Sequence, residues 1–202
     1  MKLYYSPGTC SLSPHITLLE AGLPFQAVMA STKTHKLADG TDYYSINPTG
    51  YVPLLELDDG QRLTEGAVIV QYIADLVPAS KLAPPAGSME RYRLMEWLNF
   101  ITSELHKGFS PLFMPGMPEE GKTLARTRLG ERLAWVDSQL AGRDWLLGDT
   151  FTVADTYLFT VASWGRLVRV DIAQLPTLSA YMARVAARPA VQAAMKAEGL
   201  IK

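Results

Sequence analysis

The stretch LYYSPGTCSLSPHITLLEAG, residues 3–22, predicts a strand, a turn and a helix in succession. Leu3–Tyr5 is a short apolar run typical of a strand, and a Pro-Gly turn follows it. The helix is expected over residues 11–21, because Pro14 falls in its first turn, where a missing N–H costs nothing, and Gly22 can cap its end. Cys10, the only cysteine, therefore lies at the turn where the helix begins.

The same alternation of strands and helices continues to about residue 78. Residues 25–29 predict a second strand, and an Asp-Asp-Gly turn joins the two strands of a hairpin within residues 54–64. A helix is expected over residues 65–75, so the predicted order is βαβ followed by ββα. The segment PASKLAPPAG, residues 78–87, is rich in Pro, Ala and Gly and is typical of a linker between domains.

Only helices are predicted after the linker. Apolar spacing and helix-starting prolines predict them over residues 88–109, 122–140 and 152–167, and after Pro176 and Pro189. Thr152 and Asp155 form a capping box, with Asp in the usual Glu or Gln place. The chain is therefore expected to be a two-domain α+β protein whose second domain is an all-α helical bundle.

Composition narrows the class of protein. Hydrophobic residues make up 48% and charged residues 19% of the chain, as in a folded globular protein. A net charge of -1 gives no footprint for nucleic acid, and no basic run indicates a membrane surface. One cysteine excludes an internal disulfide, and neither a signal peptide nor an apolar run of about 20 residues is visible. We expect a cytoplasmic protein without a metal.

Cys10 is the first candidate for chemistry. A thiol at a helix N-terminus meets backbone N–H groups and the positive end of the helix dipole, so its pKa should fall below the free value of about 8.5. The hydroxyl of Ser11 can donate to a sulfur anion. The alternative is a buried structural cysteine, which position alone makes equally plausible. Ser13 occupies the place of a second thiol in a CxxC pair, so any disulfide of Cys10 needs an outside thiol.

Two further places indicate a receptor for a small thiol peptide. The backbone of Val52, before Pro53, can pair with an extended peptide, and both the cis and the trans form of the bond between them are compatible with the sequence. Glu65 can take an ammonium group, while the N–H of Gly66 at the helix start takes a carboxylate. Taken alone, Val52-Pro53 is more simply the start of a strand, and Glu65 is more simply a carboxylate that is favourable at a helix N-terminus.

These segments resemble the bacterial beta-class glutathione transferases. The resemblance rests on SPGTCSLSPHITLLEAG, INPTGYVPLLELDDG, LTEGAVIVQYIAD, WLNFITSELHKGFSPLF, FTVADTYLF and the terminal AEGLIK, and it covers essentially the whole chain. It implies a thioredoxin-like domain over residues 1–80, a linker over 81–86 and an all-helical domain over 87–202. It also implies a homodimer that binds glutathione as co-substrate in a cleft between the domains.

The family also implies roles for individual residues. Cys10 would lie beside the glutathione sulfur and form a mixed disulfide with it, and Val52, before a cis-Pro53, would pair with the tripeptide backbone. The γ-glutamyl end would be held by Glu65 and Gly66. The remaining contacts, some from the partner subunit, would come from Asn99, Ser103, Glu104, His106 and Lys107.

The residues of the first long helix support this implication independently. Asn99, Ser103, His106 and Ser110 form one polar stripe, about a third of a turn from an apolar one. A polar stripe is more often a solvated face, but the histidine favours a functional one. His106 would then lower the thiol pKa or shuttle a proton.

His35 departs from the family pattern. Relatives often carry a lysine in this loop that reaches the glycine carboxylate of glutathione. A neutral histidine loses that charge-assisted contact, worth about 1.5–3 kcal/mol, although Lys33 and Lys36 are alternative donors. Glutathione affinity is therefore expected to be weaker or more pH-dependent.

The predicted function is transfer of the glutathione thiolate to hydrophobic electrophiles, together with thiol–disulfide exchange through Cys10. The apolar part of the site would comprise Phe109, Phe113, Met114 and Trp164, although such residues are more often core. Alternatives on the same fold are a non-catalytic binding or interaction protein and a glutathione-dependent reductive dehalogenase.

Overall fold

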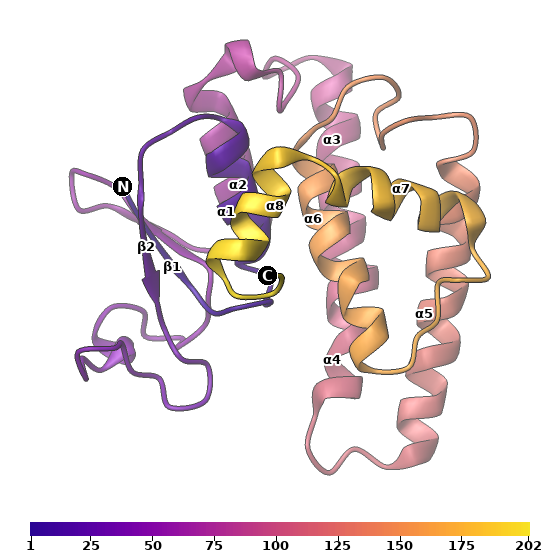
Figure 1. Ribbon diagram of the computed structural model, residues 1–202, viewed down its shortest axis with the longest axis horizontal. Coiled ribbons are helices and arrows are strands. Elements are labelled where there is room, and N and C mark those ends of the chain that lie inside the picture. Colours follow the sequence, from indigo (N-terminus) through magenta and orange to yellow (C-terminus); the bar gives the residue numbers. More distant parts are fainter. The chain divides into compact units, whose positions relative to one another are not determined.

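The computed structural model describes residues 1–202, which form two compact units. Unit 1 comprises residues 1–83 and 188–202, and unit 2 comprises residues 84–187. No helix is long and apolar enough to cross a membrane. Figure 1 shows the strands in the indigo and violet half of the chain and the long helices in the magenta to orange half.

Unit 1 contains a mixed sheet with the strand order β2-β1-β3-β4. Its elements are β1 (Lys2–Tyr5), α1 (Leu12–Glu20), β2 (Gln26–Met29), η1 (Tyr43–Ser45), β3 (Leu54–Glu56), β4 (Arg62–Leu63), α2 (Gly66–Leu76) and η2 (Pro78–Ser80). β2 runs parallel to β1, and β3 runs antiparallel to both β1 and β4. The predicted βαβ-ββα order and the thioredoxin-like fold are confirmed.

Side chains that alternate along β1 and β3 build two apolar layers in unit 1. Leu3 and Leu55 face one side and pack with residues of α1 and α2, whereas Tyr4 and Leu54 face the other side and pack with Tyr43. The sheet therefore has helices on one face and the loop of residues 30–52 on the other. That loop is held by its own buried residues.

The last helix, α8 (Pro189–Ala197), packs against α1 within unit 1 (Figure 1). Arg188 forms a bidentate ion pair with Glu20, with N–O distances of 2.7 and 2.8 Å. The carboxylate of Glu198 accepts hydrogen bonds from the backbone N–H of Gly8 and from His15. The C-terminal segment thus belongs by its contacts to unit 1, which differs from the expectation that residues 87–202 form one helical domain.

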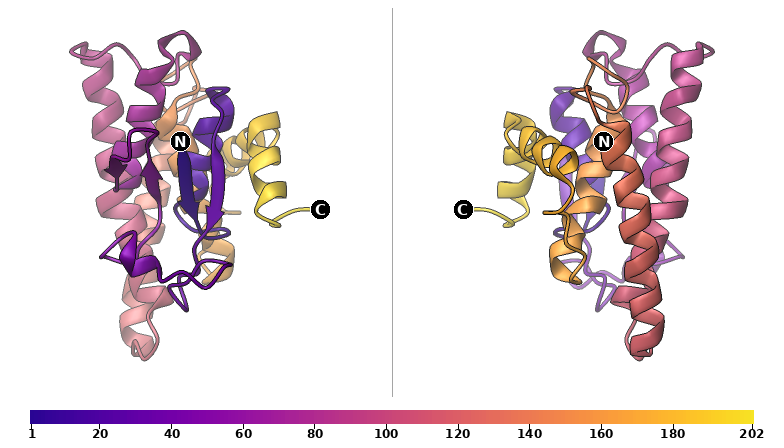
Figure 2. Two further views of the ribbon diagram at one scale, coloured as in Figure 1. Left: turned by 90° about the vertical axis from the view of Figure 1, so that its left-hand side faces the viewer. Right: turned by 90° about the vertical axis from the view of Figure 1, so that its right-hand side faces the viewer.

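Unit 2 consists of helices. They are α3 (Met89–Phe100), η3 (Ile101–His106), α4 (Lys107–Phe113), α5 (Glu119–Gln139), α6 (Val153–Ala162), η4 (Ser163–Leu167) and α7 (Pro176–Ala186). The helix expected over residues 88–109 is thus longer and includes the π-helical segment η3. Figure 2 shows α5 running alongside this long helix. Gly108 lies at this contact, and a Cβ there would lie 2.9 Å from Leu129 Cδ2, so the side chain of Leu129 would have to move to admit it.

Side-chain hydroxyl groups accompany the π-helical turn. Where the backbone widens to an i→i+5 bond, carbonyl groups lose their ordinary partners. The Thr102 hydroxyl donates to the carbonyl of Leu98 at 2.8 Å, and the Ser103 hydroxyl donates to the carbonyl of Asn99 at 3.0 Å. These bonds satisfy carbonyl groups at the start of the irregular turn.

The capping box at the start of α6 is confirmed. The fully buried carboxylate of Asp155 accepts hydrogen bonds from the N–H groups of Thr152 (2.7 Å) and Leu146 (2.9 Å) and from the Tyr181 hydroxyl (2.9 Å). Burial raises the pKa of Asp155 to about 6, and these hydrogen bonds oppose that rise. One carboxylate therefore joins the start of α6 to the loop before it and to α7.

Candidate functional site

Cys10 lies partly exposed immediately before α1 in unit 1. Its Sγ–H donates to the carbonyl of Val52, with an S–O distance of 3.2 Å. The first N–H groups of α1 donate to carbonyl groups of the preceding turn. The N–H of Leu12 donates to the carbonyl of Thr9, and the N–H of Ser13 donates to the carbonyl of Cys10. The structure therefore joins the thiol to the Val52 backbone, a contact that the sequence pattern did not predict.

Ser11 is completely buried beneath this turn. Its hydroxyl donates to the carbonyl of Ser6 (3.2 Å), accepts from the N–H of Ser6 (3.1 Å) and lies 2.9 Å from the Thr9 hydroxyl. This placement does not favour the expected bond from Ser11 to a sulfur anion. It makes Ser11 the residue that closes the turn carrying Cys10.

The Val52-Pro53 peptide bond is cis, in agreement with the family pattern. The carbonyl of the preceding residue, Tyr51, accepts hydrogen bonds from Tyr43 Oη at 2.9 Å and Asn47 Nδ2 at 2.7 Å. The N–H of Val52 donates to no group of the protein. Val52 therefore offers a free backbone donor beside a carbonyl that already meets the Cys10 thiol.

Glu65 and Gly66 lie at the start of α2, next to this backbone. Glu65 has a φ of 64°, a left-handed conformation that is uncommon for a non-glycine residue, and its exposed side chain makes no ion pair in the structure. A Cβ on Gly66 would lie 3.7 Å from Pro53 Cγ, so the helix start adjoins the cis-proline. An exposed carboxylate and helix N–H groups thus flank Val52 and Pro53.

His35 lies in the loop of residues 30–52, which also contains Gly50 and Tyr51. Its ring Nδ1 lies 3.2 Å from the carbonyl of Gly50, and its ring centroid lies 4.6 Å from that of Tyr44. Because a carbonyl only accepts, Nδ1 carries the hydrogen, and a neutral ring presents a bare Nε2. Lys33 and Lys36 are both exposed.

Gly50 is required where His35 packs. Its φ is 70°, and a Cβ there would lie 2.6 Å from Tyr44 Cε1 and 2.9 Å from His35 Nδ1. The sequence indicates the Asn-Pro-Thr-Gly turn but does not predict that His35 and Tyr44 pack against it. That packing depends on the contact between the two rings, which the turn residues alone do not specify.

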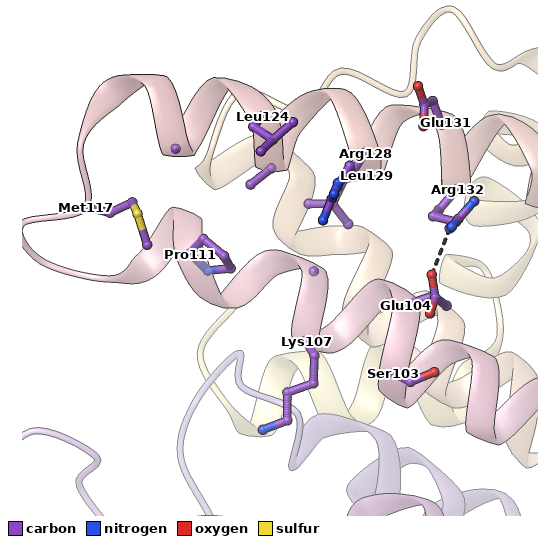
Figure 3. A pocket seen from close by; sticks show the side chains of 13 residues that line it. Ser103, Glu104, Lys107, Pro111, Met117, Leu124, Arg128, Leu129, Glu131 and Arg132 are labelled. Atoms are coloured by element: carbon purple, nitrogen blue, oxygen red, sulfur yellow. Dashed lines mark hydrogen bonds and ion pairs between the residues drawn. The ribbon is translucent and has the colours of Figure 1, made fainter.

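The polar residues from Asn99 to Lys107 in unit 2 lie in two environments. Asn99, Ser103 and Lys107 are exposed, and Glu104 forms an ion pair with Arg132 of α5 at 2.8 Å. Ser103, Glu104 and Lys107 line a groove of about 710 Å³ between α5 and the continuous segment of η3 and α4. Figure 3 shows the Glu104–Arg132 pair joining η3 to α5 and the Lys107 side chain pointing away from α5.

His106, by contrast, turns towards α6 and η4. Its Nδ1 lies 2.7 Å from the hydroxyl oxygen of Tyr157, and its ring packs nearly perpendicular to Trp164 with centroids 5.0 Å apart. Burial and the positive charge of Lys107 lower the pKa of His106 to about 4. The ring is therefore neutral near pH 7, so it does not supply a positive charge that would lower a thiol pKa.

The four residues expected to form the apolar part of the site differ in accessibility. Trp164 lies in contact with the rings of Phe109 and Phe113. Phe109 is completely buried and belongs to the core of unit 2, whereas 47% of Phe113 and 56% of Met114 are exposed. Trp164 is also buried, so only Phe113 and Met114 are open to a hydrophobic ligand.

Comparisons with known proteins agree with this arrangement. The N-terminal domain model of glutathione S-transferase matches residues 8–76, and the C-terminal domain model matches residues 100–189. The chain is 49% identical to glutathione S-transferase GstA of Escherichia coli O157:H7, over 99% of this chain and all of that protein. It is 40% identical to glutathione S-transferase GST-4.5 of Xanthomonas campestris, over 99% and 100% of the two chains.

Solved structures give the same result. A sphingomonad glutathione S-transferase complexed with glutathione has a TM-score of 0.96 and 49% identity, with all of both chains covered. The beta-class enzyme of Sphingomonas chungbukensis has a TM-score of 0.96 and 47% identity, again over both whole chains. The fold and these matches define a transferase, and the chain belongs to the glutathione S-transferase family, within its bacterial beta class. The predicted enzyme class is thus confirmed.

Proposed function

We propose that this protein binds glutathione, transfers its thiolate to hydrophobic electrophiles, and catalyses thiol–disulfide exchange through Cys10. The observation that carries the proposal is the hydrogen bond from Cys10 Sγ to the carbonyl of Val52, beside the free N–H of the same residue. A peptide that pairs with Val52 brings its own cysteine close to Cys10.

Charged groups near Val52 match the two ends of glutathione. The exposed carboxylate of Glu65 suits the ammonium group of the γ-glutamyl residue, and the N–H of Gly66 suits its carboxylate. His35, or exposed Lys33 or Lys36, would meet the glycine carboxylate. The similar sphingomonad enzyme has been solved with glutathione bound, which supports this ligand.

The two reactions use sulfur differently. In conjugation the glutathione thiolate forms a C–S bond to the electrophile, the bond to the leaving group breaks with its electron pair, and the thiol proton goes to solvent. In exchange the Cys10 thiolate attacks the glutathione sulfur of a mixed disulfide, the S–S bond breaks, and the other thiolate leaves. A second glutathione thiolate then releases glutathione disulfide and regenerates Cys10.

The helices of unit 2 supply the second part of the proposal. Phe113 and Met114 are exposed apolar side chains that suit a hydrophobic electrophile. A homodimer is also proposed, since α3 and α5 expose Met89, Met95 and Trp135, with 65%, 43% and 44% of their surfaces accessible. Analytical ultracentrifugation at micromolar concentration tests the dimer, and a single monomeric species contradicts it. Asn99, Ser103, Glu104 and Lys107 remain proposed ligands for glutathione.

Cys10→Ala separates the two activities. We expect exchange with a glutathione mixed disulfide to fall to the uncatalysed rate, because no thiol remains to attack. Conjugation to an aryl halide should persist within about threefold, because its nucleophile is the sulfur of glutathione. Mass spectrometry of the wild type with glutathione disulfide should show an adduct of glutathione mass that reductant removes.

Equal loss of both activities in Cys10→Ala contradicts this division of labour. Tyr72→Phe is a suitable control, because Tyr72 packs against the apolar core of unit 1 and is not among the proposed site residues. Absence of turnover in the wild type with glutathione and several electrophiles favours the alternative of a non-catalytic binding protein.

A further inference from the structure

The imidazole ring of His106 is fixed on two sides by aromatic rings. The Trp164 and Tyr157 rings lie at interplanar angles of 70° and 86° to it, with centroid distances of 5.0 and 6.0 Å. These contacts set the plane of the imidazole but leave open which nitrogen carries its hydrogen. The hydrogen bond between Nδ1 and Tyr157 Oη, 2.7 Å long, decides that.

The direction of this hydrogen bond follows from the chemistry of the two groups. A phenol is a good donor and a weak acceptor, because its oxygen lone pair is delocalised into the ring, whereas an imidazole nitrogen without hydrogen is a good acceptor. Thr102 does not take the hydrogen of Tyr157 from His106, because its hydroxyl oxygen lies 3.5 Å from Tyr157 Oη, too far for a good O–H···O bond. Thr102 donates its own hydrogen to the carbonyl of Leu98 at 2.8 Å.

We propose that Tyr157 is a positioning residue that donates its hydroxyl hydrogen to Nδ1 of His106, so that the neutral ring carries its hydrogen on Nε2. His106 then acts towards a substrate as an N–H hydrogen-bond donor and not as a general base. The identity of the acceptor, a sulfur anion of glutathione, rests on the proposed function. The tautomer itself does not.

The electrostatics of the ring agree with this role. Its pKa of about 4 makes His106 a weak base, which accepts a thiol proton poorly. A neutral N–H donor, by contrast, stabilises an anion at any pH above that value. The low basicity that would impair a general base is therefore no disadvantage for a donor.

Two features of the fold bring the pair together. Tyr157 lies on α6, whose first turn is held by the buried carboxylate of Asp155. His106 is the last residue of the π-helical segment, where one extra residue in a turn rotates the residues that follow by about 100°. The irregular turn thus sets the direction in which His106 points, and α6 supplies its partner.

Nitrogen NMR of the free protein tests the tautomer without any substrate. With ¹⁵N-labelled histidine near pH 7, we expect long-range spectra of His106 to show hydrogen on Nε2 in the wild type. Tyr157→Phe should give averaged signals of two tautomers, whereas Tyr72→Phe should leave the pattern unchanged. Hydrogen on Nδ1 in the wild type, or an unchanged pattern in Tyr157→Phe, overturns the proposal.

Kinetics test the role as a donor. Tyr157→Phe should lower kcat/KM for aryl-halide conjugation about three- to tenfold, the worth of one hydrogen bond. His106→Gln, which keeps an N–H near the position of Nε2, should retain several times the activity of His106→Ala. Equal activity of these two variants overturns the donor role. Failure of the wild type to turn over glutathione contradicts the proposed function instead, and leaves the NMR result intact.

Discussion

The two units of the molecule present their candidate functional residues by different physical means. In unit 1 the backbone has unusual conformations around Val52. The peptide bond before Pro53 is cis, and Glu65 and His35 have positive φ angles. In unit 2, His106 and Trp164 lie on helices and are oriented by hydrogen bonds and ring packing. Groups of the first kind are placed by the conformation of their own backbone, whereas groups of the second kind depend on a few buried partners.

The largest expected effect is on the free energy of unfolding and concerns Asp155 in unit 2. Asp155→Ala leaves the buried N–H groups of Thr152 and Leu146 and the Tyr181 hydroxyl without their acceptor. We expect the free energy of unfolding to fall by about 3–5 kcal/mol. Urea denaturation monitored by circular dichroism measures it.

Exposed Asp149, in the same unit, provides the matched control. Asp149→Ala should change the free energy of unfolding by less than about 0.5 kcal/mol. A similar loss in both variants would show that the buried network of Asp155 does not hold α6.

The next effect concerns the pH dependence of stability. The pKa of His106 lies near 4 in the folded protein, below its usual 6.5, so between these values only the unfolded chain binds the proton. The stabilisation is complete above pH 6.5 and is lost as pH falls towards 4. Asp155 acts in the opposite direction, because its pKa is raised to about 6 and its ionisation destabilises the fold as pH rises.

His106→Gln removes the first contribution and keeps the second. Relative to the wild type, the variant should gain about 2 kcal/mol in the free energy of unfolding between pH 7.5 and pH 5. Parallel denaturation series at the two pH values measure the difference. A constant difference between the two proteins would mean that His106 is not shielded from protonation.

The effect of Glu65 tests the site of unit 1, where we propose that its carboxylate binds the ammonium group of glutathione. Glu65→Gln should weaken glutathione binding about tenfold or more, since a charge-assisted hydrogen bond becomes a neutral one. N-acetylglutathione, which lacks the ammonium charge, should bind both proteins about equally. Isothermal titration calorimetry provides both values, and equal weakening for the two ligands would exclude an ammonium contact.

The smallest effect concerns His35. Its Nδ1 bonds the carbonyl of Gly50, so a neutral ring offers a carboxylate no N–H on Nε2. His35→Lys should bind glutathione about tenfold more tightly, because a lysine ammonium makes a charge-assisted contact to the glycine carboxylate, whereas Thr32→Lys, in the same loop, should not. Isothermal titration calorimetry measures these affinities, and equal binding by the wild type and His35→Lys contradicts the role of His35.

Local sequence signals predicted the elements of both units but not their irregularities. The Pro14 and Gly22 pattern located α1, and Thr152 with Asp155 located the start of α6, because caps and turns depend on neighbouring residues. The π-helical turn over 101–106 was not predicted, since its sequence also suits an ordinary helix. Its widening is decided by packing and by hydroxyl bonds within the folded unit.

The candidate site was proposed from signals of the same kind. Cys10, Val52 and Glu65 were singled out from turn and helix-start patterns, which are local. Ser11 and Phe109 were expected to face a ligand, but both are buried. Burial depends on contacts between segments that are far apart in the chain, and no local pattern encodes it.

The sequence by itself determined the order of strands and helices, the position of the single thiol and the family to which the chain belongs. The tertiary structure alone decided that the thiol meets the carbonyl of Val52, that Ser11 closes a turn, and that Tyr157 holds His106. The reason is physical. Propensities and caps act over a few residues, whereas the direction of a side chain, its protonation state and its hydrogen-bond partner depend on groups that only folding brings together.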